Sequence, residues 1–184
     1  MGRKRVIDQQ QVLDAAQAVV ARDGAARLTL DAVAAEAGIS KGAVVYDYGS
    51  KQGLIQAMVN RAVEADNAFN RAAAEPFKDS GSPVIRGRIA AAAQPFPEAF
   101  RPVAHNICVA LAEDAQLRKA IQANQSAVIA DIAQTSSQPR GALLAYLALE
   151  GLKLLETLDY HQWPDEERSR ILQEIGWLVD QRPG

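Results

Sequence analysis

The stretch TLDAVAAEAGISKGAVVYDYGSK, residues 29–51, decides the fold of this 184-residue chain. Thr29 and Ser40 each precede a run of helix-forming residues and are of the kind preferred at helix N-caps. Gly38 lies between them and offers the left-handed conformation that ends a helix. Because only residues 37–39 separate the two helices, the turn is too short for an antiparallel hairpin. We therefore predict a helix-turn-helix, a motif whose second helix enters the major groove of DNA.

The segments on either side of this motif also predict helices. Asp8, with Gln11 three residues later, is typical of a capping box, and the helix that it begins ends at Gly24. A fourth, long helix is capped by Ser50 and ends before the linker-like stretch PFKDSGSP at 76–83. Apolar periodicity places the remaining helices, within a few residues, at 84–93, 97–112, 114–133, 139–159 and 164–180.

Composition indicates an all-α fold. Apolar residues make up 48% of the chain and aromatic residues only 5%, whereas a β-sandwich would be richer in Val, Thr and aromatic residues. We expect a three-helix helix-turn-helix domain at 1–52, joined by a long helix to a C-terminal helical bundle within 53–184. The single cysteine, Cys108, allows no intramolecular disulfide. Without a secretory leader or an apolar stretch of membrane-spanning length, we expect a cytoplasmic protein with no membrane partner.

The second helix of the motif begins with residues suited to DNA. A helix N-terminus has unpaired N–H groups and a partial positive charge, which favour phosphates. Lys41 can reach a phosphate or a guanine edge, and Tyr46 can hydrogen-bond a phosphate. The net charge of −2 does not indicate nucleic-acid binding, but the basic residues 3–5 form either a DNA-contacting arm or a solvated terminus. The candidate DNA-binding residues are Arg3, Lys4, Arg5, Thr29, Ser40, Lys41, Gly42, Ala43, Tyr46 and Lys51.

A longer pattern surrounds these residues. It comprises Gly24, Leu28-Thr29-Leu30, Val33-Ala34, the run AGISKG at 37–42, Tyr46, Tyr48, Ser50-Lys51 and Leu54. This pattern resembles the DNA-binding domain of the tetracycline-repressor (TetR) family of bacterial transcription regulators. The resemblance covers residues 8–60, and beyond them only length, helicity and an apolar pair of final helices agree with the family.

The resemblance implies a homodimer whose two recognition helices read a palindromic operator in double-stranded DNA. It also implies a C-terminal domain that binds a small-molecule inducer and moves the two DNA-binding heads apart, so that the protein acts as a ligand-responsive repressor. No cofactor or metal is expected, since His105 and His161 are far apart in sequence and Cys108 has no second thiol.

Two positions depart from the family pattern. Asp47 stands where the family commonly has a histidine, and Gly49 stands where a proline is common. Because phosphate repels a carboxylate, we expect Asp47 to point away from DNA and either to pair with Lys51 or to cap the fourth helix. Tyr48, at the family's aromatic core position, is expected to pack in the core.

The C-terminal part of the chain carries candidates for dimerisation and ligand binding. The helix predicted at 139–159 is apolar around about half of its circumference, so it is either a central core helix or one between a core and a partner. With the last helix it predicts a four-helix dimer interface. The candidate interface residues are Leu143, Leu147, Gly151, Leu154, Leu155, Leu158, Ile171, Ile175 and Leu178. The candidate pocket residues are Phe69, Phe96, Phe100, Arg101, His105 and Cys108, although His105 and Cys108 also fit a plain core role.

Other functions remain open at this point. The helix-turn-helix surface could serve protein contacts in a helical interaction module that no longer binds DNA, with Asp47 as its sign. A steep salt dependence of DNA binding separates the two, because phosphate contacts release counterions. An enzyme with a helical-bundle active site comes last, because no paired acid and base residues with a shared face support it.

Overall fold

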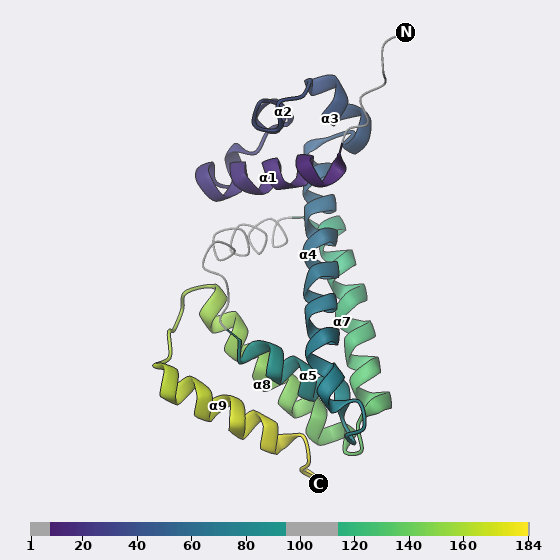
Figure 1. The fold of residues 1–184 in the computed structure, drawn as a ribbon, viewed down its shortest axis with the longest axis vertical. Coiled ribbons are helices and arrows are strands. Elements are labelled where there is room, and N and C mark those ends of the chain that lie inside the picture. Colours follow the sequence, from purple (N-terminus) through teal and green to yellow (C-terminus); the bar gives the residue numbers. More distant parts are fainter. Residues whose placement is uncertain (1–7, 95–113, 184) are drawn as a thin grey trace. The chain divides into compact units, whose positions relative to one another are not determined.

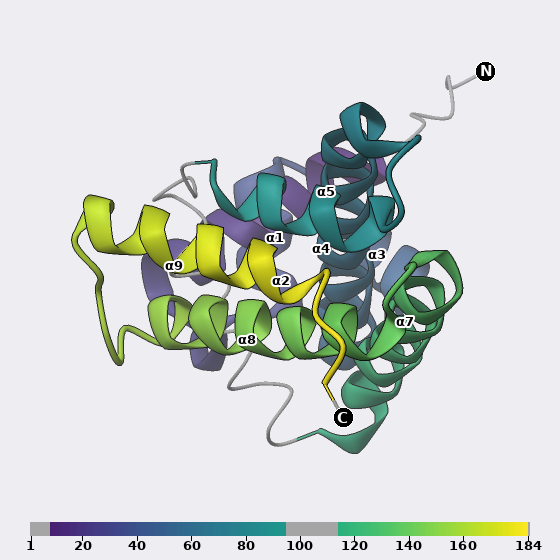
Figure 2. The same ribbon diagram turned by 90° about the horizontal axis from the view of Figure 1, so that it is seen from below.

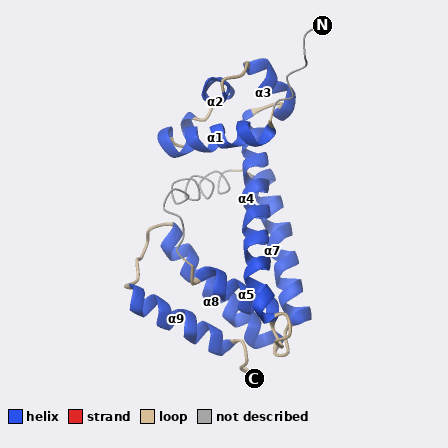
Figure 3. Ribbon diagram, in the orientation of Figure 1, coloured by secondary structure: helices blue, strands red, loops and turns tan. Residues whose placement is uncertain are grey.

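The computed structural model describes residues 8–94 and 114–183. Within these residues every regular element is helical and no strand occurs, which confirms the all-α prediction (Figure 3). Of the helices described, none is both long and apolar enough to cross a membrane.

The helices follow the chain in a simple order (Figure 1). Each predicted boundary in the described residues lies within a few residues of the observed one, and the helix predicted at 97–112 lies outside the described residues. The elements are α1 (Gln9–Asp23), the 3-10 turn η1 (Ala25–Arg27), α2 (Leu30–Ala37), α3 (Lys41–Tyr48), α4 (Lys51–Ala74), the 3-10 turn η2 (Glu75–Phe77), α5 (Pro83–Ala92), α7 (Ala115–Thr135), α8 (Pro139–Thr157) and α9 (Asp165–Leu178).

The chain divides into two compact units. Of the described residues, 8–62 and 114–120 belong to the first unit, and 63–94 and 121–183 belong to the second. The predicted division after residue 52 falls at the start of α4, whereas the first unit continues to Ala62. The reason is that Leu54 and Met58 of α4 are buried in the core of the first unit.

Side-chain caps begin the helices of the first unit, as predicted from sequence. Thr29 Oγ1 accepts from the N–H of Ala32 at 3.1 Å, and Ser40 Oγ accepts from the N–H of Ala43 at 3.2 Å. Each cap satisfies one of the N–H groups that a helix N-terminus leaves without a partner. Gly38, with φ 66° and ψ 32°, adopts the left-handed conformation between the two helices.

The first helix is capped as predicted, but without the reciprocal contact of a capping box. Asp8 accepts from the N–H of Gln10 at 2.9 Å. The side chain of Gln11 does not return to Asp8, because its Nε2 donates to the carbonyl of Ala37 at 3.3 Å. Gln11 therefore joins α1 to the end of α2, a contact that local sequence spacing does not reveal.

The second unit is built on α5, α8 and α9, which pack on one another (Figure 2). Its core includes Ile85, Ile132, Tyr146 and Leu149, each at most 3% exposed. Burial raises the pKa of Tyr146 to about 12. A close helix contact involves Gly141, where an added Cβ would lie 2.4 Å from the carbonyl oxygen of Gln181 and 2.6 Å from that of Leu178.

The contact at Gly141 predicts a stability difference between two glycine substitutions. Gly141→Ala must displace the backbone after α9, so we expect it to lower the free energy of unfolding by about 1–3 kcal/mol. Gly176→Ala is the matched control, since its Cβ meets nothing within 4 Å. Helix propensity should make that variant about 0.5–1 kcal/mol more stable than wild type. Urea denaturation followed by circular dichroism measures both, and an unchanged Gly141→Ala would contradict the close packing of α8 and α9.

Candidate functional site

Helix α3 exposes most of its surface. Val44 is its buried residue, at 0% exposure, and fixes the helix to the core of the first unit. Tyr46 is 88% exposed and the adjacent Val45 is 40% exposed. Burial of a tyrosine ring stabilises a folded protein, so a tyrosine that is this exposed is typical of a residue that contacts a partner molecule. The face of α3 that bears Tyr46 is therefore the candidate interface.

The first residues of α3 are accessible at the N-terminus of the helix. Lys41 and Gly42 are exposed, and Ala43 is half-buried. A Cβ added to Gly42 would meet only Ser40 Oγ, at 3.9 Å, so this chain leaves space for a partner to approach the backbone. Together with the partial positive charge of a helix N-terminus, the exposed amides at this position suit a phosphate.

Lys41 has an intramolecular partner that the sequence did not indicate. Its Nζ lies 2.8 Å from Asp31 Oδ2, and both side chains are more than half exposed. Asp31 belongs to the first turn of α2, where it complements the helix dipole. An exposed ion pair of this kind contributes little stability, so Lys41 can exchange Asp31 for a phosphate at small cost.

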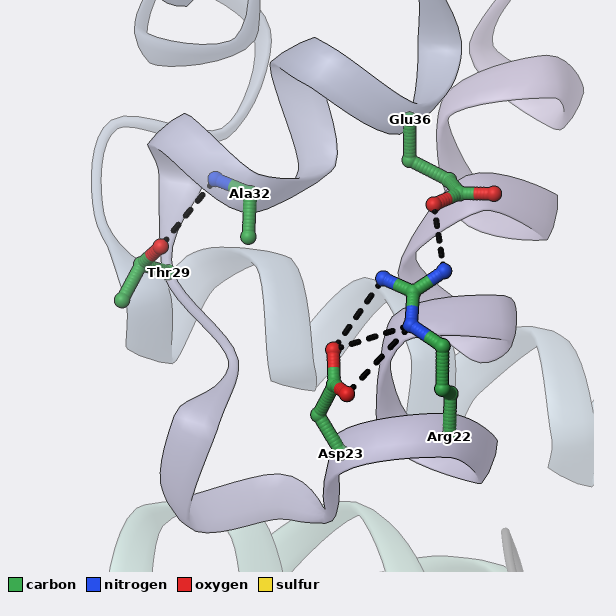
Figure 4. Close-up of polar contacts among 5 residues, drawn as sticks. All are labelled: Arg22, Asp23, Thr29, Ala32 and Glu36. Carbon is green, nitrogen blue, oxygen red and sulfur yellow. Dashed lines mark hydrogen bonds and ion pairs between the residues drawn. The ribbon is translucent and has the colours of Figure 1, made fainter.

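Arg22 fixes α2 against the end of α1 (Figure 4). Its Nη1 donates to Glu36 Oε2 at 2.8 Å, while its Nη2 donates to Asp23 Oδ2 at 3.1 Å. The hydrogen bond to Glu36, and then that to Asp23, raises the pKa of the Arg22 guanidinium. The same close-up shows Thr29 at the start of α2, with its Oγ1 engaged by Ala32. The exposed Thr29 hydroxyl keeps its own proton to donate.

Lys51 has intramolecular partners that the sequence did not indicate. Lys51 Nζ donates to the carbonyls of Ala25 at 3.1 Å and Ala26 at 3.3 Å. These carbonyls belong to η1, so the ammonium group ties the start of α4 to the turn between α1 and α2. Lys51 therefore has a structural role within the first unit, and its contact with a phosphate stays a prediction.

Asp47 does neither of the two things predicted for it. Lys51 is engaged with η1, and Ser50 Oγ, not Asp47, accepts from the N–H of Gly53 in the first turn of α4. Tyr48 packs against the core as predicted, and its hydroxyl donates to the Gln9 carbonyl at 3.2 Å. Burial, followed by the nearby Asp47 carboxylate, raises the pKa of Tyr48.

Several predicted residues lie outside the described part of the chain. They are Arg3, Lys4 and Arg5 of the basic arm, and Phe96, Phe100, Arg101, His105 and Cys108 of the predicted pocket. Phe69 is described, but it is 46% exposed and does not line a cavity that the second unit forms between α4, α5 and α7.

That cavity has a volume of about 210 Å³ and lies between α4, α5 and α7. Sequence reasoning missed it, because its polar lining combines α4 and α5 with α7, which follows much later in the chain. Arg88 of α5 and the asparagines Asn67 and Asn124 contribute to this lining. Within residues 8–94 and 114–183, no three His, Cys, Asp or Glu side chains gather closely enough to hold a metal ion.

Helix α8 has two apolar faces. One face, with Ala145 and Leu149, is buried in the second unit. The other carries Leu147 and Leu154, which are 56% and 52% exposed, and the exposed residues Gly151 and Leu155. Leu143 and Leu158 are half-buried.

The last helix contributes less to this surface than the sequence indicated. Ile175 is only 4% exposed and belongs to the core, so it is not available to a partner, and this part of the prediction is wrong. Ile171 and Leu178 are half-buried and pack against the same core. The exposed apolar residue of α9 is Trp177, at 64%, which the sequence analysis did not select.

Comparison with known proteins matches both units to one family. Residues 12–58 match the family model described as bacterial regulatory proteins, tetR family, and residues 82–180 match the model described as tetracyclin repressor-like, C-terminal domain. The chain belongs to the tetR family. No significant relative was found among curated protein sequences.

Several solved structures share the fold of this chain. A TetR-family transcriptional regulator from Rhodococcus sp. is 21% identical with a TM-score of 0.72, over 93% of this chain and 98% of that one. A TetR-family regulator from Mesorhizobium loti is 15% identical with a TM-score of 0.73, over 92% and 94%. The multidrug binding protein EbrR, complexed with malachite green, is 22% identical with a TM-score of 0.72, over 94% and 98%.

Lys51 and Lys41 of this tetR-family chain have different contacts, so their substitution should affect stability differently. Lys51→Met removes a charged donor from two carbonyls, so we expect it to lower the free energy of unfolding by about 1 kcal/mol. Lys41→Met is the matched control and removes only an exposed ion pair, which should cost about 0.3 kcal/mol. Urea denaturation measures both variants. A smaller loss for Lys51→Met than for Lys41→Met would contradict the structural role of Lys51.

Proposed function

We propose that this tetR-family protein is a ligand-responsive transcriptional repressor, which binds a palindromic operator as a homodimer and is released by a small-molecule inducer. The observation that carries the proposal is the exposed face of α3, with Tyr46 almost fully in solvent beside an open helix N-terminus. That combination is suited to a helix that enters the major groove of DNA.

Residues of α3 and of the segments before it have different roles in the proposed DNA contact. Lys41 exchanges Asp31 for a phosphate, and the exposed backbone at Gly42 allows close approach to the groove. The Tyr46 hydroxyl donates to a phosphate or its ring lies on the sugars. The cap between Ser40 and Ala43 stabilises the first turn of α3. The Thr29 hydroxyl, whose oxygen accepts from Ala32, donates a hydrogen bond to the flanking DNA backbone. Arg3, Lys4 and Arg5 remain proposed phosphate contacts.

The outer face of α8 is the proposed dimer interface. Leu147, Gly151, Leu154 and Leu155 recur at helical spacing on the side opposite the buried face. An interface of this kind relates two copies by a two-fold axis, which matches the symmetry of a palindromic operator.

The proposal that a small molecule regulates the protein is supported by the second unit. EbrR, which shares the fold, has been crystallised with imidazole, malachite green and ethidium. In this chain the second unit holds a cavity of about 210 Å³. A ligand releases DNA if it binds the DNA-incompetent arrangement of the dimer more tightly, with a coupling of about 1–3 kcal/mol.

DNA binding is tested by substitution on α3. Lys41→Ala and Tyr46→Ala should each weaken binding to the DNA upstream of the protein's own gene by about tenfold, or 1.4 kcal/mol. Lys41→Ala should also make the dependence on salt shallower by about one unit of slope. Tyr160→Ala is the matched control, because Tyr160 is 73% exposed in the second unit. Fluorescence anisotropy at two salt concentrations measures these effects.

Either of two results would contradict this account of α3. Unchanged affinity in both variants would remove Lys41 and Tyr46 from the interface. Folded protein with no salt-sensitive DNA binding would favour the alternative, in which the exposed face of α3 contacts a protein.

Dimerisation is tested on α8. Leu154→Glu places a charge on the proposed interface, so we expect the dimer to dissociate while the monomer stays folded, since the side chain is 52% exposed. Ile129→Glu on α7 is the matched control, because Ile129 is an exposed apolar residue, at 39%, outside the interface. Sedimentation velocity measures the oligomeric state. A Leu154→Glu protein that remains dimeric would place the interface elsewhere.

A further inference from the structure

Arg88 is a buried cation in the second unit. Its residue is 7% exposed, and a guanidinium stays protonated at every pH at which proteins are folded. Transfer of such a charge out of water is costly unless close partners compensate for the lost hydration. The partners of Arg88 therefore decide whether its position is explained by the protein alone.

The contacts of Arg88 are long. Nη1 lies 3.8 Å from the Asp66 carboxylate, which is about half exposed, and Nη2 donates to Asn67 Oδ1 at 3.4 Å. Arg88 Cζ lies 5.9 Å from the centroid of the Tyr146 ring. Nε is buried and has no hydrogen-bond partner in the described part of the chain. Charge-assisted hydrogen bonds are normally near 2.8 Å, so this guanidinium is poorly compensated.

Other arginines of the same unit show what full compensation looks like. Arg86, two residues earlier on α5, places Nη2 at 2.7 Å and 2.8 Å from the two carboxylate oxygens of Asp180. Arg168 contacts both oxygens of Glu156 at 2.7 Å and 3.1 Å. These two side chains are more exposed than that of Arg88 and still have closer carboxylates. Arg88 is thus more buried than these two arginines and has longer contacts to its partners.

The cavity beside Arg88 offers the remaining parts of a binding site. Asn67 Nδ2 donates to Asn124 Oδ1 at 2.7 Å, so the two amides form a fixed chain with the guanidinium. Ala74, Val84 and Val128 supply an apolar wall. The lining also includes two exposed residues of opposite charge, Arg71 and Asp131.

We propose that this cavity binds a small organic carboxylate, with the carboxylate on Arg88 and the apolar body against the wall of Ala74, Val84 and Val128. The inference rests on the proposed function, since it names the chemical class of the regulating ligand. A guanidinium matches the planar geometry of a carboxylate and binds it through two parallel hydrogen bonds.

The first test uses the full chain and three probes, namely benzoate, hexanoate and succinate. At least one of them should raise the unfolding temperature in a dose-dependent way, because a ligand that binds only the folded state stabilises it. Benzamide, which has the shape of benzoate without its charge, should bind at least about tenfold more weakly, a difference of about 1.4 kcal/mol. Calorimetric titration gives the dissociation constants.

Substitutions then place the bound carboxylate. Arg88→Met should lower the affinity for the carboxylate by at least about tenfold. Arg86→Met is the matched control on the same helix and should leave the affinity unchanged, since Arg86 is engaged with Asp180. Asn124→Asp keeps the acceptor for Asn67 and adds a competing carboxylate to the cavity, so it should weaken binding even if Arg88→Met does not fold.

The outcomes separate this inference from the proposed function. It is overturned if none of the three carboxylates stabilises the protein at about 10 mM, which corresponds to a binding free energy of only about −2.7 kcal/mol. Equal binding of benzamide, or full affinity in both Arg88→Met and Asn124→Asp, overturns it as well. If specific operator binding is found in such a case, the repressor proposal stands alone. Arg88-dependent carboxylate binding without operator binding supports the site and contradicts the repressor.

Discussion

The turn at Gly38 fixes how the two helices of the DNA-binding motif meet. Its left-handed conformation is open to glycine at no steric cost, and the N–H groups of Gly38 and Ile39 donate to the carbonyls of Ala35 and Ala34. These hydrogen bonds end α2, and α3 then begins at Lys41 with Ser40 as its N-cap. With Val44 held in the core, the rest of α3 has its residues half-buried or exposed. The exposure of Tyr46 follows from this short turn.

Charged side chains serve two purposes in this protein. Arg22 joins α1 to α2, Arg61 joins α4 to Asp14 of α1 at 2.6 Å, and Arg86 joins α5 to the segment after α9. Each of these cations has a close carboxylate in the fold. Lys41 has an exposed partner that it can exchange, and Arg88 has only long contacts. Lys41 and Arg88, which we propose to bind DNA and ligand, are thus the cations with weak or incomplete contacts inside the protein.

Local features of the fold could be predicted from sequence, because they depend on neighbouring residues. The caps at Asp8, Thr29 and Ser40, the stop at Gly38 and the helix boundaries all follow from residues within one turn. The exposed Tyr46 and the outer face of α8 were likewise accessible from helical periodicity and the family pattern.

Contacts between distant segments could not be predicted in this way. The bond from Lys51 to η1 and the pair of Lys41 with Asp31 depend on how the helices cross, which periodicity does not specify. Ile175 shares an apolar stripe with Leu178, and only packing shows that Ile175 is the one buried in the core. Arg88 reads as an ordinary surface arginine in the sequence, and its cavity exists only once α4, α5 and α7 come together.

The measurement that tests the central claim most directly is a hydroxyl-radical footprint of the full chain on the DNA upstream of its own gene, at low and high salt. The account predicts two protected half-sites related by a two-fold axis, with contacts to successive turns of the major groove and protection that fades steeply as salt rises. A folded, dimeric protein that protects no such pair of sites at low salt would contradict the claim that α3 reads an operator there.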